Sequence, residues 1–397
     1  MKLKLGLLPQ IILAILLGVV IGSISPEWLV KGFATFNGIF GNFIGFVIPF
    51  IIIGFIAPGI GQLGKGAGKL LGITTGLAYI STIFAGLLAF AASLSILPNF
   101  ISGNQLVKTD NPEEFLLSPY FEIGMPPVME VMSALIFSFI IGIGLASIKG
   151  NTLQNAFEDF QKIVEKLIKT AIIPLLPFHI FGIFANMTYG GQVQSILSVF
   201  AKVFVLIILL HITMLLIQYC TSGLLTKNNP IKLLKIMSPA YFTALGTQSS
   251  AATIPVTLGQ VKKTGVQSKI ADFSVPLLAT VHLSGSTITL VCCAMGVLFM
   301  NGTTPSFEMM IPFILMLGVT MVAAPGVPGG AVMAAIGLLE TMLGFDPTMV
   351  SLMIALYLAQ DSLGTATNVT GDGALTMLVN KFSTKKPQKM KESQLAG

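Results

Sequence analysis

Residues 359–373 read AQDSLGTATNVTGDG and lie inside an apolar run that extends from residue 347 to residue 380. Asp361, Thr365, Asn368 and Asp372 recur there at offsets of 0, 4, 7 and 11. On a helix these offsets fall on one stripe, within roughly 60° of each other. An ionisable side chain within a membrane is costly, so two carboxylates with a carboxamide between them indicate a cation path or a ligand contact. The alternative is polar contact between helices, which rarely needs an acid.

The chain has the composition of a membrane protein. Of its 397 residues, 54% are hydrophobic and 10% are charged, whereas about a quarter are charged in soluble proteins. A membrane-crossing helix needs about 20 apolar residues, and the first run carries no signal-peptide cleavage site, so we expect it to be retained. Eight runs are long enough to cross, namely residues 6–25, 36–61, 70–98, 129–148, 167–187, 196–225, 270–301 and 347–380.

Two further apolar stretches, residues 236–261 and 309–343, are interrupted by small, polar and proline residues at 249–255 and 324–330. We interpret both as re-entrant hairpins. Their non-helical tips leave backbone groups free, which is tolerated at membrane depth only inside protein or beside a ligand cavity. The predicted fold is therefore an all-α integral membrane protein with eight transmembrane helices and two re-entrant hairpins. The hairpins enter from opposite sides, an inverted pair typical of a transporter core.

The positions of the lysines predict the orientation. The net charge is +6 and all 22 basic residues are lysine. With the N-terminus in the cytoplasm, every lysine falls inside except Lys31 and Lys108 outside and Lys202 within a span, as the positive-inside rule requires. We therefore expect a multi-pass protein of the cell inner or plasma membrane, with both termini cytoplasmic, a basic tail at 384–397, and the lipid bilayer rather than nucleic acid as its partner. A charged segment, residues 156–169, is predicted to lie along the cytoplasmic surface.

The seventh span is interrupted by polar residues at 280–287. Gly285 among small hydroxyls predicts an unwound turn, where free carbonyls and the Ser284 and Ser286 hydroxyls can bind a dehydrated cation. His282 has two interpretations, a hydrogen-bonded core histidine or a proton carrier. His179 and His211 have no ionisable neighbour and are interpreted as structural. No catalytic motif or P-loop is present, so we predict a protein that is not an enzyme and is driven by a gradient.

Three motifs in this order resemble the dicarboxylate/amino acid:cation symporter family, which includes the glutamate transporter homologues. They are QSSAATIPV at 248–256, GVPG at 326–329 and NVTGD at 368–372, and the resemblance covers most of the chain. It implies a homotrimer with an elevator-like motion in which the second hairpin is the outer gate. Residues 1–225 would form helices 1–6, comprising the scaffold and part of the mobile domain. Residues 226–383 would form the substrate and cation core.

The resemblance also implies the roles of individual residues. Asp361 would hold the α-amino group of a substrate, while Asn368 and Ser250 would hold its α-carboxylate. The implied substrate-binding residues are Ser250, Ser286, Val327, Asp361, Gly364, Thr365 and Asn368. Asp372 and Asn368 look like one sodium site, Ser81 and Thr82 like hydroxyl ligands of a second, and backbone carbonyls near Thr280 and the second hairpin like a third. The implied cation-binding residues are Ser81, Thr82, Thr280, His282, Asn368 and Asp372.

The sequence departs from the family pattern at two places. Acidic-substrate members carry an arginine where this chain has Gly364, and the chain contains no arginine, so an acidic side chain would be left unpaired at a cost of several kcal/mol. The family motif Asn-Met-Asp-Gly-Thr is replaced by HLSGS at 282–286. This removes a carboxamide at His282 and a carboxylate at Ser284, so we expect that sodium site to be weakened or lost and fewer ions to be coupled.

These observations predict a symporter that moves a small neutral amino acid such as serine, threonine or alanine with Na⁺, and that has no cofactor besides the coupling ion. Proton coupling through His282 and Asp361 is the alternative within the same fold, followed by transport of glutamate or aspartate. A channel or a non-transporting receptor belongs to a different class and would not concentrate solute.

Overall fold

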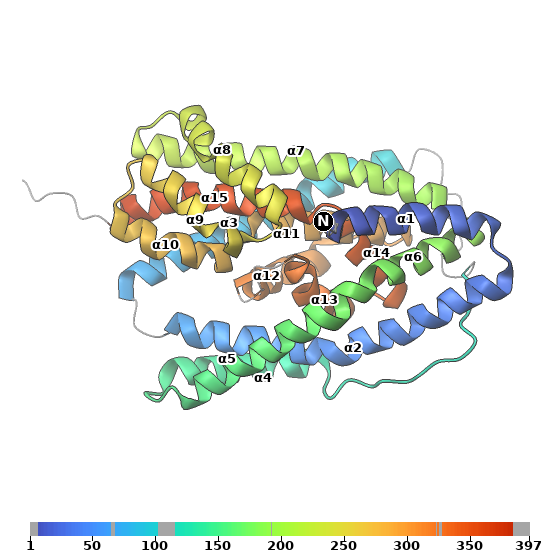
Figure 1. The fold of residues 1–397 in the computed structure, drawn as a ribbon. Helices are drawn as coiled ribbons and strands as arrows, with labels where there is room; N and C mark the ends of the chain where they lie inside the picture. Colours follow the sequence, from blue (N-terminus) through green and yellow to red (C-terminus); the bar gives the residue numbers. More distant parts are fainter. Residues whose placement is uncertain are drawn as a thin grey trace, which may run out of the picture.

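A computed structural model describes residues 7–64, 68–101, 116–191, 193–322, 324 and 328–383. Within these ranges the regular elements are all helices, and they lie mostly along one long axis (Figure 1). Their bounds are α1 Leu7–Ile24, α2 Glu27–Gly64, α3 Gly68–Ile101, α4 Val131–Ser147, α5 Thr152–Leu167, a π-helical turn at Ile168–Ile172, α6 Ile173–Tyr189, α7 Val193–Thr226, α8 Pro230–Thr247, α9 Ser250–Lys263, α10 Ser268–Val281, α11 Ser284–Met300, α12 Phe307–Val322, α13 Gly330–Leu343, α14 Pro347–Leu358 and α15 Asp361–Ser383.

The helices have the length and composition of a multi-pass membrane protein. Among the described residues, five stretches are long and apolar enough to cross a membrane, and the bent pair α14 and α15 makes a sixth. The five are Glu27–Gly61, Leu70–Pro98, Thr152–Tyr189, Ile196–Thr226 and Ser268–Met300. Shorter apolar helices lie at Pro9–Ile24, Ile136–Ser147, Phe307–Val322 and Gly330–Leu343.

Helices α8 and α9 pack against each other as a hairpin. The chain turns at Gln248, whose φ is +52°, and the Ser249 hydroxyl caps α9 by accepting a hydrogen bond from the Ala252 N–H (3.2 Å). We predicted a non-helical tip over residues 249–255, but Ser250 already begins α9. The tip is shorter because the Ser249 cap lets the helix start at once, with Pro255 tolerated inside it.

Helices α12 and α13 form a second packed pair, with the break where we predicted it. Gly329 precedes α13 with a φ of +73°, a left-handed conformation that glycine adopts without strain. Both helices pack on other elements, α12 on α3 and α13 on α2 and α14.

Two long apolar runs are each divided into two helices. Residues 270–301 break at His282 and Leu283, three and two residues before the turn that we predicted at Gly285. Residues 347–380, predicted as one span, break at Ala359 and Gln360 with a bend of 59°. The Gln360 side chain donates to the Leu356 carbonyl there (3.3 Å). No glycine or proline marks this second break, so the sequence pattern gave no sign of it.

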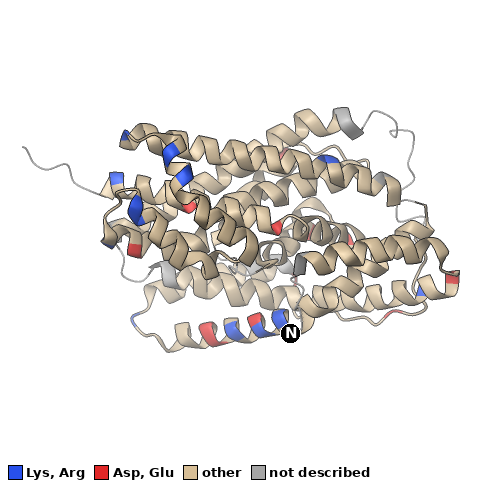
Figure 2. Cartoon of the chain, turned by 45° about the horizontal axis from the view of Figure 1, so that its top comes forward, with Lys and Arg blue, Asp and Glu red and all other residues tan. Residues whose placement is uncertain are grey.

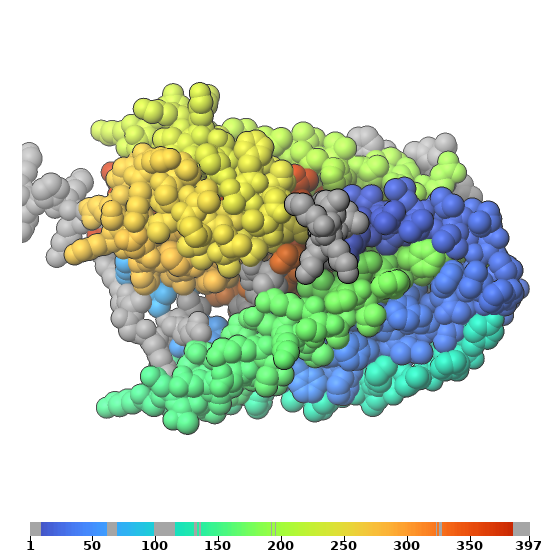
Figure 3. All heavy atoms as spheres, in the orientation of Figure 1, coloured from blue at the N-terminus to red at the C-terminus, as the bar shows by residue number. Residues whose placement is uncertain are grey.

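The helices form two groups. One group contains α1, α2, α4, α5 and α6, and the other contains α3 and α7–α15, packed around α11 and α15. Between the groups, α13 lies on α2 and α4, and α14 lies on α6, where His179 Nε2 is 2.9 Å from Ser351 Oγ. Elsewhere a hollow separates α8–α10 from α5 and α6, at the left of Figure 3.

Charged residues are most frequent at the α8–α10 end of the molecule and on α5 (Figure 2). Helix α5 is amphipathic: Gln154 and Val164 are buried, while Lys162 pairs with Asp159 on its exposed face (2.8 Å). The predicted charged segment at 156–169 therefore lies on α5 and the turn after it.

Helices α1 and α6 pack closely through two glycines spaced four residues apart. A methyl group at Gly18 would lie 2.7 Å from the Phe181 carbonyl oxygen and 2.9 Å from Phe184 Cβ. One at Gly22 would lie 2.8 Å from Ala185 Cα. Small residues at this spacing let two backbones approach each other in membranes, where no hydrophobic force draws helices together.

Replacing Gly18 with alanine should therefore destabilise the protein by about 1–3 kcal/mol, because the obstructing atoms are α6 backbone atoms and a Cβ attached directly to that backbone, which cannot move aside. The thermal unfolding midpoint in detergent measures the effect. Gly72→Ala on α3 is the matched control, since a methyl group there would meet nothing within 4 Å. Equal midpoints for the two variants would show that the α1–α6 contact is not this tight.

Candidate functional site

The polar stripe predicted from the sequence lies on α15 and is buried. Asp361, Thr365, Asn368 and Asp372 are 4%, 5%, 1% and 1% exposed. Helix α15 is enclosed by α3, α7, α8, α9, α10 and α11. The four side chains therefore face protein rather than lipid, which is the environment that an ionisable group in a membrane requires.

Asp361 begins α15 and connects it to the second helix pair. Its Oδ2 accepts a hydrogen bond from the Gly329 N–H (2.7 Å), immediately before α13. The buried Tyr357 hydroxyl lies close to both Asp361 and Ser286. The Asp361 carboxylate thus faces the residue that precedes α13.

Asn368 holds the start of α11. Its Oδ1 accepts from the Gly285 and Ser286 N–H groups (2.7 and 3.2 Å), and its Nδ2 donates to Ser286 Oγ (2.9 Å). The first N–H groups of a helix have no partner within the helix, so a carboxamide from a neighbouring helix is a suitable cap. Ser286 and Asn368, predicted to share a pocket, are therefore in direct contact.

Helices α11 and α15 approach closely at two glycines. A methyl group at Gly285 would lie 2.7 Å from Thr367 Cβ, and one at Gly364 would lie 3.4 Å from both Ser286 N and Thr289 Oγ1. Position 364 therefore faces the beginning of α11. On the other side of this contact, His211 of α7 approaches the Gly285 carbonyl oxygen (Nε2 to O, 3.0 Å), so His211 has the structural hydrogen bond that we expected.

Of the other predicted substrate contacts, Thr365 is buried on α15 and Ser250 is buried at the start of α9. Helices α9 and α15 pack against each other, so both residues belong to the same core. Val327 lies outside the described residues.

His282 lies at the break between α10 and α11 and contacts two predicted cation-binding residues. Its Nδ1 is 2.8 Å from Asp372 Oδ1, and its Nε2 is 3.0 Å from Ser81 Oγ on α3. When Asp372 is ionised its carboxylate only accepts hydrogen bonds, and Nδ1 is then the donor. The second carboxylate oxygen, Asp372 Oδ2, is buried and has no hydrogen-bond partner among the described residues.

The sequence reasoning missed Gln218, a buried residue of α7 that completes this cluster. Its Nε2 donates to Ser81 Oγ (3.0 Å) and to Ser284 Oγ (3.3 Å), and lies 3.4 Å from His282 Nε2. The available signal was a carboxamide within the apolar run at 196–225, which is itself unusual inside a span.

Thr82 and Thr280 are placed differently from each other. Thr82 is buried next to Ser81, and its Oγ1 has no hydrogen-bond partner among the described residues. Thr280 is exposed at the end of α10 and its hydroxyl donates to the Leu277 carbonyl (2.8 Å). Its side chain is therefore satisfied locally.

The ligand atoms beside Asp372 suit a sodium ion better than those of the Ser81, His282 and Ser284 cluster. Sodium is a hard cation that prefers oxygen ligands. Asp372 Oδ2 is a buried, unpartnered carboxylate oxygen, beside the α10–α11 break where helix-end carbonyls are available. The cluster of Ser81, His282 and Ser284, by contrast, is already supplied with N–H donors from Gln218.

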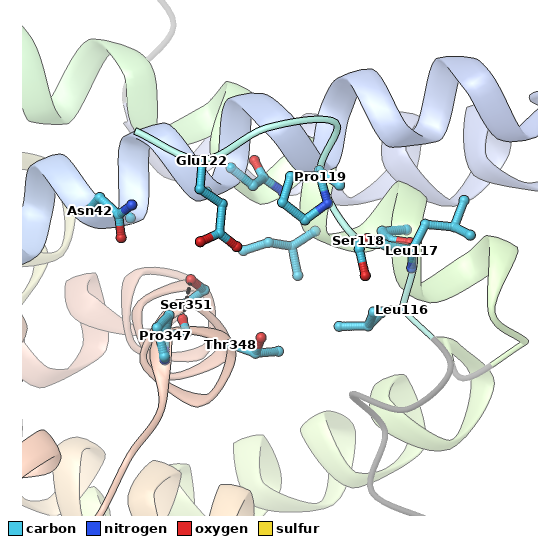
Figure 4. Close-up of a pocket in the computed structure, with 15 residues that line it drawn as sticks. Asn42, Leu116, Leu117, Ser118, Pro119, Glu122, Pro347, Thr348 and Ser351 are labelled. Atoms are coloured by element: carbon cyan, nitrogen blue, oxygen red, sulfur yellow. Dashed lines mark hydrogen bonds between the residues drawn. The ribbon is translucent and has the colours of Figure 1, made fainter. Parts of the chain in front are cut away.

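A cavity of about 420 Å³ lies elsewhere, between the two groups of helices (Figure 4). Asn42 of α2, the extended segment with Ser118 and Glu122, and Thr348 and Ser351 of α14 line it. It does not include Asp361 or Asn368, so it is separate from the α15 cluster.

The sequence is similar over nearly its whole length to known transport proteins. A family model described as the sodium:dicarboxylate symporter family matches residues 7–382. The serine/threonine transporter SstT of Acinetobacter baumannii (strain AYE) is 26% identical over 390 residues, covering 95% of this chain and 97% of that protein. The protein of the same name from Campylobacter jejuni subsp. jejuni serotype O:23/36 (strain 81-176) is 28% identical over 406 residues, covering 95% and 96%.

The cap made by Asn368 can be tested by substitution. Asn368→Ala leaves two buried N–H groups without their acceptor and should lower stability by about 1–3 kcal/mol. Asn380→Ala is the control, because Asn380 lies on the same helix and also accepts a backbone N–H, from Gln267, but at an exposed position. Thermal unfolding in detergent should show a large loss for Asn368→Ala and a small one for Asn380→Ala. Equal losses would contradict the capping role.

Proposed function

The chain belongs to the sodium:dicarboxylate symporter family, and from this premise we propose that it carries serine or threonine across the membrane together with sodium ions. It is a transporter rather than an enzyme. The observation that carries the proposal is the buried Asp361 carboxylate, which faces the Gly329 N–H at the tip of α12–α13 in a chain without arginine. Relatives that match over nearly their whole length are named serine/threonine transporters, which supports the same substrate class.

The substrate site that we propose is built on the α15 stripe. The α-amino group pairs with Asp361, which is the buried anion closest to the hairpin tip. The hydroxyls of Ser250, Ser286 and Thr365 and the remaining Asn368 hydrogen offer polar contacts to the α-carboxylate and to a hydroxylated side chain. No guanidinium is available for a second carboxylate, so glutamate and aspartate are disfavoured.

We further propose eight transmembrane helices, with α8–α9 and α12–α13 as the two re-entrant hairpins, and cytoplasmic termini in a homotrimer. The packing into two groups supports an elevator-like motion, because α13 and α14 make most of the contact between a scaffold group and a mobile group. The cavity beside α14 leaves room for that helix to move. We propose that the lysine-rich end of the molecule (Figure 2) faces the cytoplasm, and the hollow in Figure 3 lies at that end.

Sodium is the proposed coupling ion, and no other cofactor is needed. The unpartnered Asp372 Oδ2 supports a sodium site beside the α10–α11 break. The contact between His282 and Asp372 favours one rival, coupling to protons through the imidazole ring. The two ions make different predictions for the driving gradient.

Proteoliposomes with an inward sodium gradient should accumulate labelled serine above the external concentration. The same vesicles should not accumulate serine under a proton gradient alone, and should not accumulate labelled aspartate, because its side chain would be unpaired. Proton-driven accumulation would instead establish the rival ion. Uptake that only equilibrates would indicate a channel, which cannot concentrate solute.

Asp361→Asn should weaken serine binding by at least ~100-fold, because removing one partner of a buried charge pair costs about 3–5 kcal/mol. Binding to purified protein, measured by isothermal titration calorimetry, separates this effect from transport. Asp272→Asn is the matched control, since Asp272 is exposed and pairs with Lys262 away from the stripe. An unchanged serine affinity in Asp361→Asn would remove Asp361 from the amino-group contact.

A further inference from the structure

The Gln218 carboxamide lies among three residues at which the family resemblance implies cation contacts, and the structure brings these three together. That resemblance assigns cation contacts to Ser81 and to positions 282 and 284. Gln218 Nε2 lies 3.0 Å from Ser81 Oγ, 3.4 Å from His282 Nε2 and 3.3 Å from Ser284 Oγ. One nitrogen from α7 therefore contacts atoms of α3, α11 and the break before α11, as a bound ion would.

The chemistry of these atoms favours an N–H donor over a cation. Position 282 offers a ring nitrogen and position 284 a hydroxyl, so no carboxylate remains among the three contacts. The Ser81 and Ser284 oxygens already accept hydrogens from Gln218. A sodium ion placed among them would approach N–H hydrogens, whereas it requires several oxygen ligands.

Asp372 does not restore the missing charge to this cluster. Its Oδ1 is engaged by His282 Nδ1 (2.8 Å), so the imidazole ring stands between the carboxylate and Ser81. The other oxygen, Oδ2, is the one left without a described partner. One Asp372 oxygen therefore contacts His282, and the other belongs to the sodium site that we propose beside the α10–α11 break.

The absence of a side chain at Gly371 leaves room for the side chains of Gln218 and His282. A methyl group at this position would lie 2.6 Å from Gln218 Oε1 and 3.0 Å from both Gln218 Nε2 and His282 Cε1. Any larger residue on α15 would therefore push the carboxamide and the ring out of the cluster. Gly371, Gln218 and His282 are therefore complementary in size although they lie on three different segments. The sequence pattern did not predict this contact.

We propose that the Gln218 carboxamide, together with His282, permanently takes the place of one coupling cation. Sodium then binds at one position fewer than the three that the family resemblance implies, and each transport cycle carries one sodium ion fewer. The count per cycle rests on the proposed sodium symport, but the closure of the site by Gln218 does not.

Equilibrium binding of ²²Na⁺ to the purified protein tests the closed site without transport. His282→Asn with Ser284→Asp returns the family's carboxamide and carboxylate but keeps Gln218, whose N–H groups can still fill the site. Adding Gln218→Ala to these two changes removes the occupant. The triple variant should bind one more sodium ion per chain than the wild type, and the double variant should not. Equal counts in the wild type and the triple variant, or a full gain in the double variant, would overturn the proposal.

A second measurement uses the wild type alone, in case the triple variant does not fold. The membrane potential at which net serine flux is zero gives the ratio of sodium to serine in proteoliposomes. A ratio of two or less agrees with the closed site, and a ratio of three overturns it. If serine uptake is not driven by sodium at all, the proposed function fails, while the ²²Na⁺ count still decides whether Gln218 closes the site.

Discussion

Every backbone group freed at a helix break inside this protein must find a partner within the protein, because the membrane interior supplies no water. Where the structure describes the core, it has four such breaks, and a polar side chain lies at each. The side chains that bond to backbone there are Ser249 at the α8–α9 tip, Asp361 at the α12–α13 tip, Asn368 at the start of α11 and Gln360 at the end of α14. Each helix break therefore requires a polar side chain beside it. As a result, the polar side chains of the core lie mainly on and around α15.

Two of these partners belong to the stripe that we propose as the substrate site, so the same atoms serve the fold and the ligand. Asn368 Oδ1 already accepts from Gly285 N and Ser286 N, and one Nδ2 hydrogen is donated to Ser286 Oγ. A substrate carboxylate can therefore take only the remaining Nδ2 hydrogen. Asp361, in contrast, accepts one N–H from Gly329 and lies close to the Tyr357 hydroxyl, and in the proposed site this carboxylate pairs with the ammonium group. The stripe thus offers a stronger contact to the amino end than to the carboxylate end.

The sequence predicted features that appear as a regular spacing of residues along one helix. It did not predict which residues of different helices contact each other. The offsets of Asp361, Asn368 and Asp372 predicted a shared face, and the small and polar tips predicted the helix pairs. The break at Gln360 was missed because no glycine or proline marks it. The Gln360 side chain, rather than a backbone N–H, donates to the Leu356 carbonyl there. Gln218 was missed because its partners lie more than 60 residues away in the chain, on other helices. The spacing of Gly18 and Gly22 could have suggested close packing, but not that α6 is the partner.

Charge balance connects the substrate to the number of ions. Asp361 and Asp372 are the buried carboxylates among the described residues, and both in ionised form contribute a charge of −2 to the core. Moving uncompensated charge through a membrane is costly. A zwitterionic amino acid adds no net charge, so two sodium ions make the loaded core neutral and a third would leave it positive. The proposed replacement of one cation by the uncharged Gln218 carboxamide therefore suits a neutral substrate, and so does the absence of the arginine that an acidic substrate would require.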